Sequence, residues 1–448
     1  MIRSIFRPQP LLCLLAGLLC VFRITGAAEV PAKQDPGIFT LQVAGEATQE
    51  AASSPLNPNI FAGHKDERNA EWSGLYNVKR ILMEDVQAKL AVVGGQYFER
   101  GELATLLRVQ EAALTFTSET GTNKLTLGKE RTIWSQDTVF HPIDVVGRYN
   151  YPKSAIGKNA DDPFLQEGVF GAKLKSFTEY TSYEFLIADA RKNTAFSANW
   201  QVAAKLGIRV GVNDVTTIFE KSADHPTRWG LSLSRNLGES WTFYSEYLHA
   251  GVRELPVLRQ ESPIVAVGPN LDLPARYTYA QDATSTRQIF LASFQHNLEA
   301  GSIVEVGYYF NGHGYTASEW KHWLDALHSA ASTFSDARYS QFFPSYSNNP
   351  YAAFLGESAL LARDFYLRRN YLHLRWDSLN TLPFGQIEFN ELYGLDDHSA
   401  TSQLVFTKAL QRNMIFKAYL MLQRSTPDIE SGLIPVKSAL GANVTISF

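Results

Sequence analysis

The chain has 448 residues, of which 45 are acidic and 41 basic, so its formal net charge is −4. This charge excludes a generally basic nucleic-acid binder. Hydrophobic residues make up 45% of the chain and aromatic residues 12%. Beyond the N-terminal segment, however, no run approaches the ~18 consecutive apolar residues of a membrane-spanning helix. An exported soluble all-β protein and a transmembrane β-barrel are the two classes that remain.

Residues 1–28 have the pattern of a cleaved signal peptide. Two arginines precede the apolar stretch LLCLLAGLLCVF, and small residues at Gly26 and Ala28 suit cleavage after Ala28. Both cysteines of the chain lie inside this segment. The exported protein therefore forms no disulfide and must be stabilised by its size or by closure of its fold.

Strict alternation of apolar and polar residues recurs along the rest of the chain, which is typical of strands whose two faces meet different surroundings. In VAAKLGIRVGV, for example, the apolar residues Val202 to Val212 alternate with Lys205, Gly207 and Arg209. Sixteen strands are predicted, near residues 38–47, 84–94, 107–117, 124–132, 167–177, 180–189, 200–212, 227–236, 240–250, 286–297, 301–311, 365–376, 384–394, 401–409, 412–422 and 437–448. An even number of strands of about ten residues is what a bacterial outer-membrane barrel requires.

The predicted connections alternate in length. NLGES, NLEAG, NTLPFG and KALQRN are short polar turns, and residues 46–72 read as a long first loop. The other long connections are 133–166, 213–226, 251–285, 312–364 and 423–436. Short turns at one end and long loops at the other suit an outer-membrane barrel with periplasmic turns and external loops.

The predicted strand 124–132 presents a conflict. If Leu125 and Leu127 face outward, alternation sends Lys129 outward too. A charge that faces lipid at mid-bilayer costs ~2–4 kcal/mol, and the cost falls toward zero near the interface. Either this strand end rises above the membrane, or Gly128 marks a β-bulge that reverses the phase. Of the two, we expect the bulge.

Within the long connection 312–364, the stretch ASEWKHWLDALHSAASTF breaks the strand pattern. Trp320, Trp323, Leu324 and Leu327 follow helical spacing, and Ser318 is a candidate N-cap. Two hypotheses follow for this loop. It either constricts or covers the pore, or it forms an external cap that packs on the rim.

The last twelve residues, KSALGANVTISF, again alternate and end on an aromatic ring. The pattern predicts that Val444, Ile446 and Phe448 face lipid, and that this strand closes the sheet against IFTLQVAG near residue 38. In hydrocarbon only helices and closed barrels satisfy every backbone polar group. We therefore predict an all-β fold: a closed antiparallel transmembrane β-barrel of about 16 strands over residues 38–448.

If the apolar faces point outward, the opposite faces line the lumen. By strand parity they carry nine basic and five acidic residues: Lys89, Glu111, Lys173, Lys175, Glu184, Lys205, Arg209, Arg228, Glu246, Glu305, Arg375, Glu388, Lys417 and Lys437. Basic side chains around a narrow aqueous passage favour anions. The alternative is that these charges pair with one another and only satisfy the interior of the barrel.

The sequence offers no signature of an enzyme, a cofactor or a metal site. No G-x-S-x-G, H-E-x-x-H or P-loop motif occurs. His322 and His328 are six residues apart, whereas two histidines on one helical face would be four apart. His313, between two glycines, reads as a turn residue. A TonB-dependent transporter is also disfavoured, because residues 29–37 are too few for a plug domain.

Residues 107–147 read as strand, tight turn, strand and a loop with a tryptophan and a P-x-D segment. The stretch resembles a pattern in a family of largely uncharacterised Gram-negative porin-like barrels. The matching residues are Glu111, Ala112, Leu127, Gly128, Lys129, Trp134, Pro142 and Asp144. Those barrels often have glycine after the tryptophan, where this chain has Ser135. The resemblance implies an outer-membrane channel but no particular substrate.

Two further resemblances are fainter. The strand and loop layout is similar to that of alginate-export barrels, whose basic lumen passes an acidic polysaccharide. Phe448 resembles the terminal aromatic residue that outer-membrane barrels present to their insertion machinery.

These observations predict an outer-membrane porin, monomeric or homotrimeric, for passive diffusion of small hydrophilic solutes, with a preference for anions as a further expectation. Its expected partners are outer-membrane lipid, the barrel-insertion machinery and the solutes themselves. One alternative is an exporter of an acidic polysaccharide. The alternative from another class is a soluble exported β-protein that binds carbohydrate or another surface.

Overall fold

The computed structural model describes residues 37–50, 54–56, 66–99, 102–135, 140–146, 168–189, 200–222, 226–268, 271–282, 286–298, 301–340, 342–343, 348–378, 382, 384–424, 426–433 and 436–448. Residues 37–448 form one unit. The predicted signal peptide, residues 1–28, lies outside the described residues.

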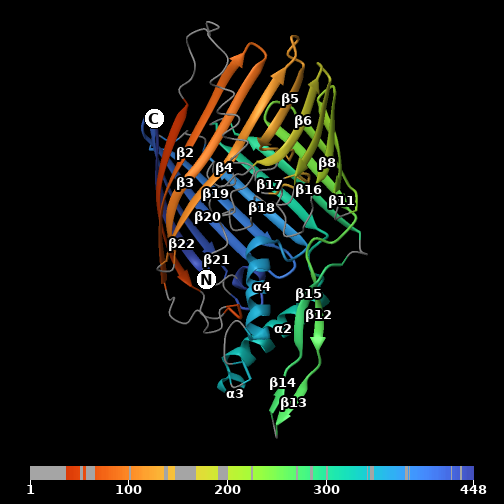
Figure 1. Ribbon diagram of the computed structural model, residues 1–448, viewed down its shortest axis with the longest axis vertical. Helices are drawn as coiled ribbons and strands as arrows, with labels where there is room; N and C mark the ends of the chain where they lie inside the picture. Colours follow the sequence, from red (N-terminus) through yellow and green to blue (C-terminus); the bar gives the residue numbers. More distant parts are fainter. Residues whose placement is uncertain are drawn as a thin grey trace, which may run out of the picture. The chain divides into compact units, whose positions relative to one another are not determined.

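Eighteen strands of the described chain form one antiparallel sheet. They are β1 (Ile38–Glu50), β2 (Asp66–Met83), β3 (Val86–Glu99), β4 (Glu102–Thr117), β5 (Asn123–Glu130), β6 (Val169–Phe177), β7 (Thr181–Asp189), β8 (Gln201–Val210), β9 (Asn213–Ser222), β10 (Arg228–Leu237), β11 (Trp241–Ala250), β16 (Arg287–Asn297), β17 (Ile303–Asn311), β18 (Asn370–Asp377), β19 (Gln386–Gly394), β20 (Ala400–Gln411), β21 (Met414–Gln423) and β22 (Val436–Ser447). Each strand pairs with its neighbours in chain order, and Figure 1 shows the resulting wall of tilted strands.

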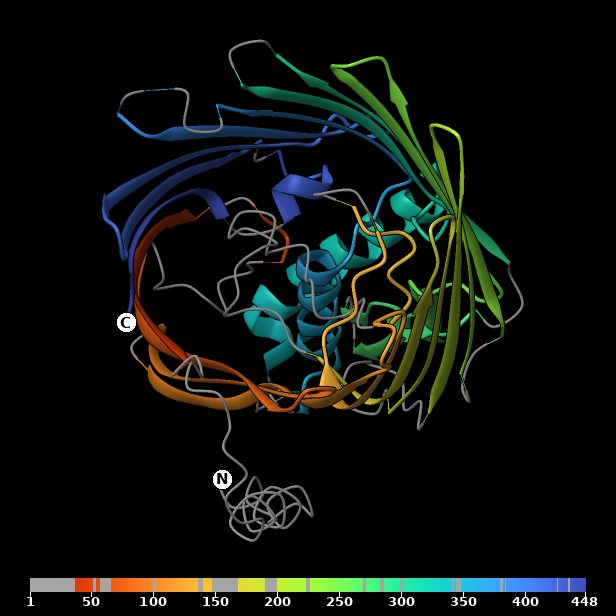
Figure 2. The ribbon, with the colours of Figure 1, turned by 90° about the horizontal axis from the view of Figure 1, so that it is seen from above.

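The sheet closes on itself where the last strand meets the first. β22 pairs with β1 in an antiparallel register that includes Val43 with Val444. Phe39 and Phe448 exchange two backbone hydrogen bonds (N···O 3.3 and 2.8 Å), and their ring centroids lie 6.2 Å apart. The predicted fold class, a closed all-β antiparallel barrel, is confirmed, and Figure 2 shows the ring from above.

The barrel has eighteen strands rather than about sixteen because β2 and β9 were not predicted. In β2 charged and polar residues interrupt the apolar positions, so the segment read as part of a long first loop. β9 follows β8 after a two-residue turn, in which Gly211 has a φ of 61°. The alternation of apolar and polar residues continues through that turn without a break. For this reason residues 213–226 were wrongly predicted to be a long connection.

The two faces of the wall differ as alternation predicts. Large apolar side chains cover the outer face, among them Val43, Leu107 and Leu440, which are 54%, 78% and 60% exposed. Polar and charged side chains occupy the inner face and are buried at many positions. An apolar exterior over a polar interior is the arrangement of a barrel that lies in lipid.

The expected bulge at Gly128 is wrong. β5 keeps a continuous register with both β4 and β6, so Lys129 stays on the outward phase. A bulge lies instead in β4, where the register with β3 shifts and skips Gln110. The Lys129 ammonium donates a hydrogen bond to the Val109 carbonyl at 2.7 Å, and this contact satisfies part of its charge.

Three connections carry additional helices or strands. β12 (Val257–Ser262), β13 (Val265–Gly268), β14 (Leu271–Leu273) and β15 (Arg276–Ala280) lie between β11 and β16. α2 (Ala317–Ser335), α3 (Ala337–Ser340) and α4 (Pro350–Asp364) lie between β17 and β18, and α5 (Glu430–Leu433) precedes β22. We call β12–β15 with α2–α4 the cap (Figure 1).

The helix predicted in the connection 312–364 is present as α2, but its N-cap is Thr316 rather than Ser318. The Thr316 hydroxyl accepts the Glu319 backbone N–H, and the Glu319 carboxylate accepts the Thr316 backbone N–H at 2.8 Å. This reciprocal capping box satisfies two amide groups at the helix start, whereas Ser318 lies within the first turn. Across the described chain, no helix is both long and apolar enough to cross a membrane.

Two glycines with positive φ offer a matched test of the wall. A Cβ at Gly128 (φ 125°) would collide with the Ala112 carbonyl oxygen of β4, whereas a Cβ at Gly121 (φ 73°), in the β4–β5 turn, meets nothing within 4 Å. We expect Gly128→Ala to lower the free energy of unfolding by roughly 1–3 kcal/mol. Gly121→Ala costs only about 1 kcal/mol. Urea unfolding in detergent micelles measures both, and equal losses would contradict the strand register described above.

Candidate functional site: the barrel interior

The connections divide the barrel into two distinct ends. Short turns join β2 to β3, β8 to β9 and β20 to β21, and residues 37 and 448 lie at the same end. We call it the turn end. The opposite, loop end carries the β5–β6 connection, the cap and α5, and Figure 1 shows the cap beyond the strands there.

Part of the β5–β6 connection folds inside the barrel, as Figure 2 shows in yellow-orange. We call residues 131–135 and 140–146 the inner segment. Its buried apolar residues form one cluster with the inner faces of β6–β19. The members of the cluster are Trp134, Phe140, Ile143, Val145 and Val146 from the inner segment, and Val169, Leu186, Ala188, Ala203, Ile218, Tyr244, Leu248, Ile289, Leu291, Tyr309, Tyr371 and Leu392 from the wall. The lumen is therefore narrowed from the side of these strands.

A buried carboxylate holds the inner segment in its turn. Asp144 accepts the backbone N–H of Trp134 and that of Ser135, the latter at 2.7 Å. The His141 ring lies 3.4 Å from the other Asp144 carboxylate oxygen. Hydrogen bonds to a carboxylate are stronger than those to a neutral acceptor, so Asp144 fixes the turn between the two halves of the segment.

Side chains of the wall hold the inner segment at three places. The Trp134 indole N–H donates to Glu184 of β7 at 2.9 Å. The Ser135 hydroxyl donates to Glu246 of β11 at 2.6 Å. Phe140 stacks on Tyr309 of β17, with ring centroids 4.1 Å apart and an interplanar angle of 14°. These contacts span strands from β7 to β17 and fix the segment across the lumen.

Most of the predicted lumen cations are in ion pairs. Lys173 pairs with Glu130, Lys175 with Glu184 at 2.9 Å, and Arg209 with Asp214 at 2.8 Å. The distances in the remaining pairs are Arg228–Glu220 2.9 Å, Arg228–Glu254 2.9 Å, Arg375–Asp377 3.1 Å, Arg375–Glu388 3.3 Å and Lys89–Glu111 2.7 Å. This arrangement favours the hypothesis that the interior charges satisfy one another.

The other predicted lumen residues have different surroundings. Glu305, 1% exposed, lies 3.2 Å from the His373 ring and accepts the Tyr244 hydroxyl. Lys205 is half-buried and stands opposite Glu184 in the register of β7 and β8. The register also places Lys417 on the inner face, where it is half-buried. Lys437 is exposed and lies at an irregularity where the register of β22 with β1 shifts.

The inner face carries charged residues that the sequence did not reveal. The acidic ones are Glu46, Glu71, Glu130, Asp214, Glu220 and Asp377. The basic ones are Lys79, Arg108, Lys124 and Arg287. Four of these ten lie on β2 and β9, the strands that were not predicted. Acids outnumber bases among the additions, so the basic excess of the predicted lumen becomes smaller.

The family-like motif divides between wall and inner segment. Gly128 and Lys129 lie on β5, whereas Trp134, Pro142 and Asp144 are buried in the inner segment. The sequence identified these residues but not their location inside the barrel. The available signal was FHPIDVV, because an exposed loop rarely carries four large apolar residues in seven positions.

The cap is fastened to itself and to the rim by buried polar contacts. Arg253, fully buried, donates to Glu319 at 2.6 Å and to the His313 carbonyl at 2.9 Å. The Trp323 indole N–H donates to the Tyr279 hydroxyl at 2.6 Å. Burial raises the pKa of Tyr279, so this hydroxyl is neutral at physiological pH. Figure 2 shows the helices within the outline of the barrel.

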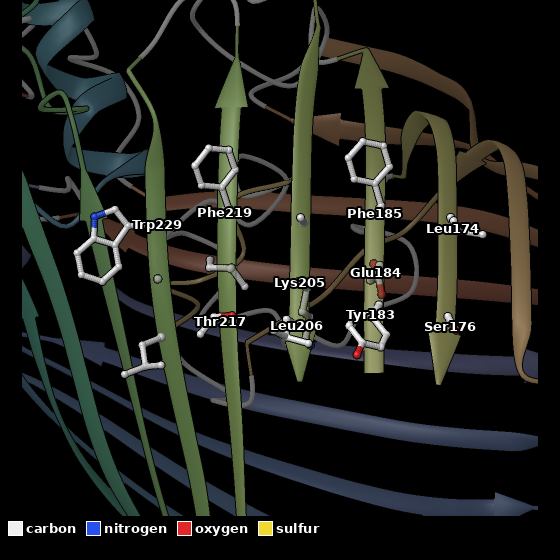
Figure 3. A pocket seen from close by; sticks show the side chains of 14 residues that line it. Leu174, Ser176, Tyr183, Glu184, Phe185, Lys205, Leu206, Thr217, Phe219 and Trp229 are labelled. Carbon is white, nitrogen blue, oxygen red and sulfur yellow. The ribbon is translucent and has the colours of Figure 1, made fainter. Parts of the chain in front are cut away.

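A separate groove of about 560 Å³ lies on the outer face of β6–β10 (Figure 3). Its walls include Phe185, Phe219 and Trp229, which belong to the outward phase of their strands. Being apolar and outward-facing, it belongs to the surface that lipid would cover, and it is not the passage through the barrel.

The residues that the structure describes contain no cluster of three or more histidine, cysteine or acidic side chains suited to a metal ion. No protein-family model matches the chain, and no curated protein matches it. Solved structures do resemble it. The outer membrane protein OprD from Pseudomonas aeruginosa has a TM-score of 0.50 and 9% identity, over 93% of this chain and 94% of that chain.

OccAB1 from Acinetobacter baumannii has a TM-score of 0.50 and 11% identity, over 92% of this chain and 96% of that chain. At such identities the likeness shows the fold alone: the chain has the closed-barrel fold of these proteins. The resemblances through the 107–147 motif and to alginate-export barrels stay predictions.

Loss of the Asp144 carboxylate should loosen the inner segment. In Asp144→Ala, the backbone N–H groups of Trp134 and Ser135 lose their acceptor, at a cost on the order of 1–3 kcal/mol for each buried group. We expect faster amide hydrogen exchange in peptides covering residues 132–146. Asp336→Ala, which removes a partly exposed carboxylate of the cap, is the control. Equal exchange in both variants would contradict the anchoring role.

Acid should loosen the start of α2. Burial raises the pKa of Glu319, but hydrogen bonds from Arg253 and Thr316 outweigh it and hold this pKa below its ordinary value. A depressed acid stabilises the fold above its unfolded pKa of ~4.3, and this stabilisation is lost as pH falls through the folded pKa. We expect hydrogen exchange at the start of α2 to accelerate, relative to the intrinsic rate, below about pH 4.

Glu319→Gln should remove most of that pH dependence, because the amide does not titrate. Glu357→Gln, at an exposed position of α4, is the matched control. A control variant that loses the acid response as fully as Glu319→Gln would overturn this assignment.

Proposed function

We propose that the protein is an outer-membrane porin through which small hydrophilic solutes diffuse passively. The observation that carries the proposal is the closed barrel with an apolar outer face, a charged inner face and a segment folded across its lumen. Such a wall satisfies its backbone inside hydrocarbon and leaves polar groups for water and solute. The fold shared with OprD supports the same proposal.

In this proposal the inner segment is the constriction and the cap narrows access at the loop end. The inner segment contacts strands from β6 to β19 inside the wall, whereas α2 and α3 lie beyond the strand ends. The connection 312–364 then covers the mouth of the pore, which is the first of the two hypotheses for this loop. The residues 1–28 act as a signal peptide, and Phe448 serves the insertion machinery.

The predicted preference for anions becomes a modest one in this proposal. Ion pairs neutralise Lys173, Lys175, Arg209, Arg228 and Arg375, so these residues add little net positive potential. Among the inner-face side chains named above, bases slightly outnumber acids, and this small excess sets the expected sign.

The alternatives are less well supported. Export of an acidic polysaccharide needs a continuous cationic path, whereas the cations named above are paired. A soluble exported β-protein would expose the outer apolar wall to water, including Leu107 and Leu440.

Reconstitution in planar bilayers tests the proposal. The purified protein should form open channels whose reversal potential under a salt gradient corresponds to weak anion selectivity. Swelling of liposomes in a series of sugars of graded size should show a sharp size limit. OprD reconstituted in parallel controls for insertion. Failure to conduct in both assays would refute a porin, and cation selectivity would refute only the anion preference.

A further inference from the structure

The inner face of the barrel is not uniform around its circumference. On the strands that the inner segment covers, wall side chains are sealed: Ala203, Leu248, Ile289 and Leu291 are each 0% exposed. These residues are apolar and in contact with the inner segment through one cluster. At this level water and solute therefore have no access to these four wall side chains, although Arg209 of β8, next to the β8–β9 turn, is exposed.

The strands β20–β22 and β1–β4 present a different inner face, which we call the seam arc because it includes the closing pair. Many of its inner side chains are polar, although Leu75, Ala91 and Val93 of β2 and β3 form a small buried apolar cluster. Glu71 and Lys79 are exposed, and Glu46, Lys417 and Tyr419 are half-buried, although Gln42 and Gln403 on the same arc are buried. Exposure of inward side chains means that solvent reaches this part of the wall.

One contact on the seam arc depends on a glycine. The Tyr419 hydroxyl of β21 donates to the Glu46 carboxylate of β1, two strands away. To do so the ring lies across Gly441 of β22, where a Cβ would collide with the Tyr419 ring. The glycine thus keeps a tyrosine–carboxylate pair flat against the wall at the seam.

Lys417 lies two residues from Tyr419 on the same face of β21. The register places Lys417 opposite Asn443, Asn443 opposite Ala44, and Ala44 opposite Glu71. Lys417 and Glu71 therefore share one row, three strands or about 14 Å apart along the wall. Within the described part of the chain the Lys417 ammonium makes no ion pair, unlike most cations of the covered strands.

We propose that solutes pass the level of the inner segment along the seam arc, and that Lys417 and the flat Tyr419–Glu46 pair contact them there. The proposal rests on the proposed porin function and specifies the route that solutes take through the barrel. Where the inner segment packs, the covered strands give a sealed apolar wall, whereas the seam arc, outside its own small apolar cluster, gives hydrogen-bonding groups of both signs. A polar solute that leaves bulk water needs such groups along its path.

Cysteine modification during single-channel recording tests the route. Cys13 and Cys20 are the only cysteines of the chain, so serine at both gives a thiol-free background. Lys417→Cys is compared with Ser232→Cys, an inward residue of β10 that is 1% exposed. We expect the anionic reagent 2-sulfonatoethyl methanethiosulfonate to cause a stepwise loss of current in Lys417→Cys and no change in Ser232→Cys.

A second variant controls for any loss of function that the replacement of the lysine itself causes. Asn443→Cys, opposite Lys417 on β22, retains the lysine and should also lose current on modification. Heat-modifiable gel migration confirms that each variant forms a barrel. If the wild type conducts, a loss of current in Ser232→Cys alone, or in none of the variants, would overturn the proposed route. A wild type that forms no channel would instead overturn the porin function on which the route rests.

Discussion

Closure of the sheet is the constraint on which the rest of the structure depends. A strand in hydrocarbon has no water to satisfy its N–H and C=O groups, so every edge must find a partner. β22 supplies that partner to β1, from Val436 to the hydrogen bonds between Phe39 and Phe448. Once the ring is closed, alternation divides each strand into an outer and an inner side chain set.

Closure also creates the interior that the inner segment occupies. A barrel of eighteen strands is too wide for wall side chains alone to fill. The β5–β6 connection enters this space because it carries a buried apolar set, Phe140 and Ile143 among them, that matches the inner faces of β6–β19. Its polar atoms are satisfied by carboxylates: Asp144 within the segment, and Glu184 and Glu246 on the wall. Packing and hydrogen bonding together fix it to one side, which leaves the seam arc for solute.

The parts of the fold that depend on strict alternation could be predicted from the sequence. The closing strand, the short turns and the inward phase of Lys173 and Glu246 all follow from a period of two. β2 could not be predicted, because its charged residues interrupt the apolar positions. β9 was hidden by a two-residue turn at Gly211, which alternation alone does not mark.

The candidate site was less predictable for a physical reason. Parity tells which side a residue faces, but not which residue stands beside it on the neighbouring strand. The ion pairs of Lys175 with Glu184 and of Arg209 with Asp214 depend on the strand order and register. The position of the inner segment depends on long-range contacts, of Trp134 with Glu184 of β7 and of Phe140 with Tyr309 of β17. The count of basic residues predicted from the sequence therefore overestimated the net positive charge of the interior.

The central claim is that the inner segment narrows the lumen, and shortening the β5–β6 connection tests it most directly. In the variant, residues 132–167 are replaced by a short turn of the kind that joins β8 to β9. The wall contacts of all eighteen strands are retained, so the variant should fold and insert. The account predicts a single-channel conductance well above that of the wild type, with permeation of larger sugars. An unchanged conductance and size limit would contradict it.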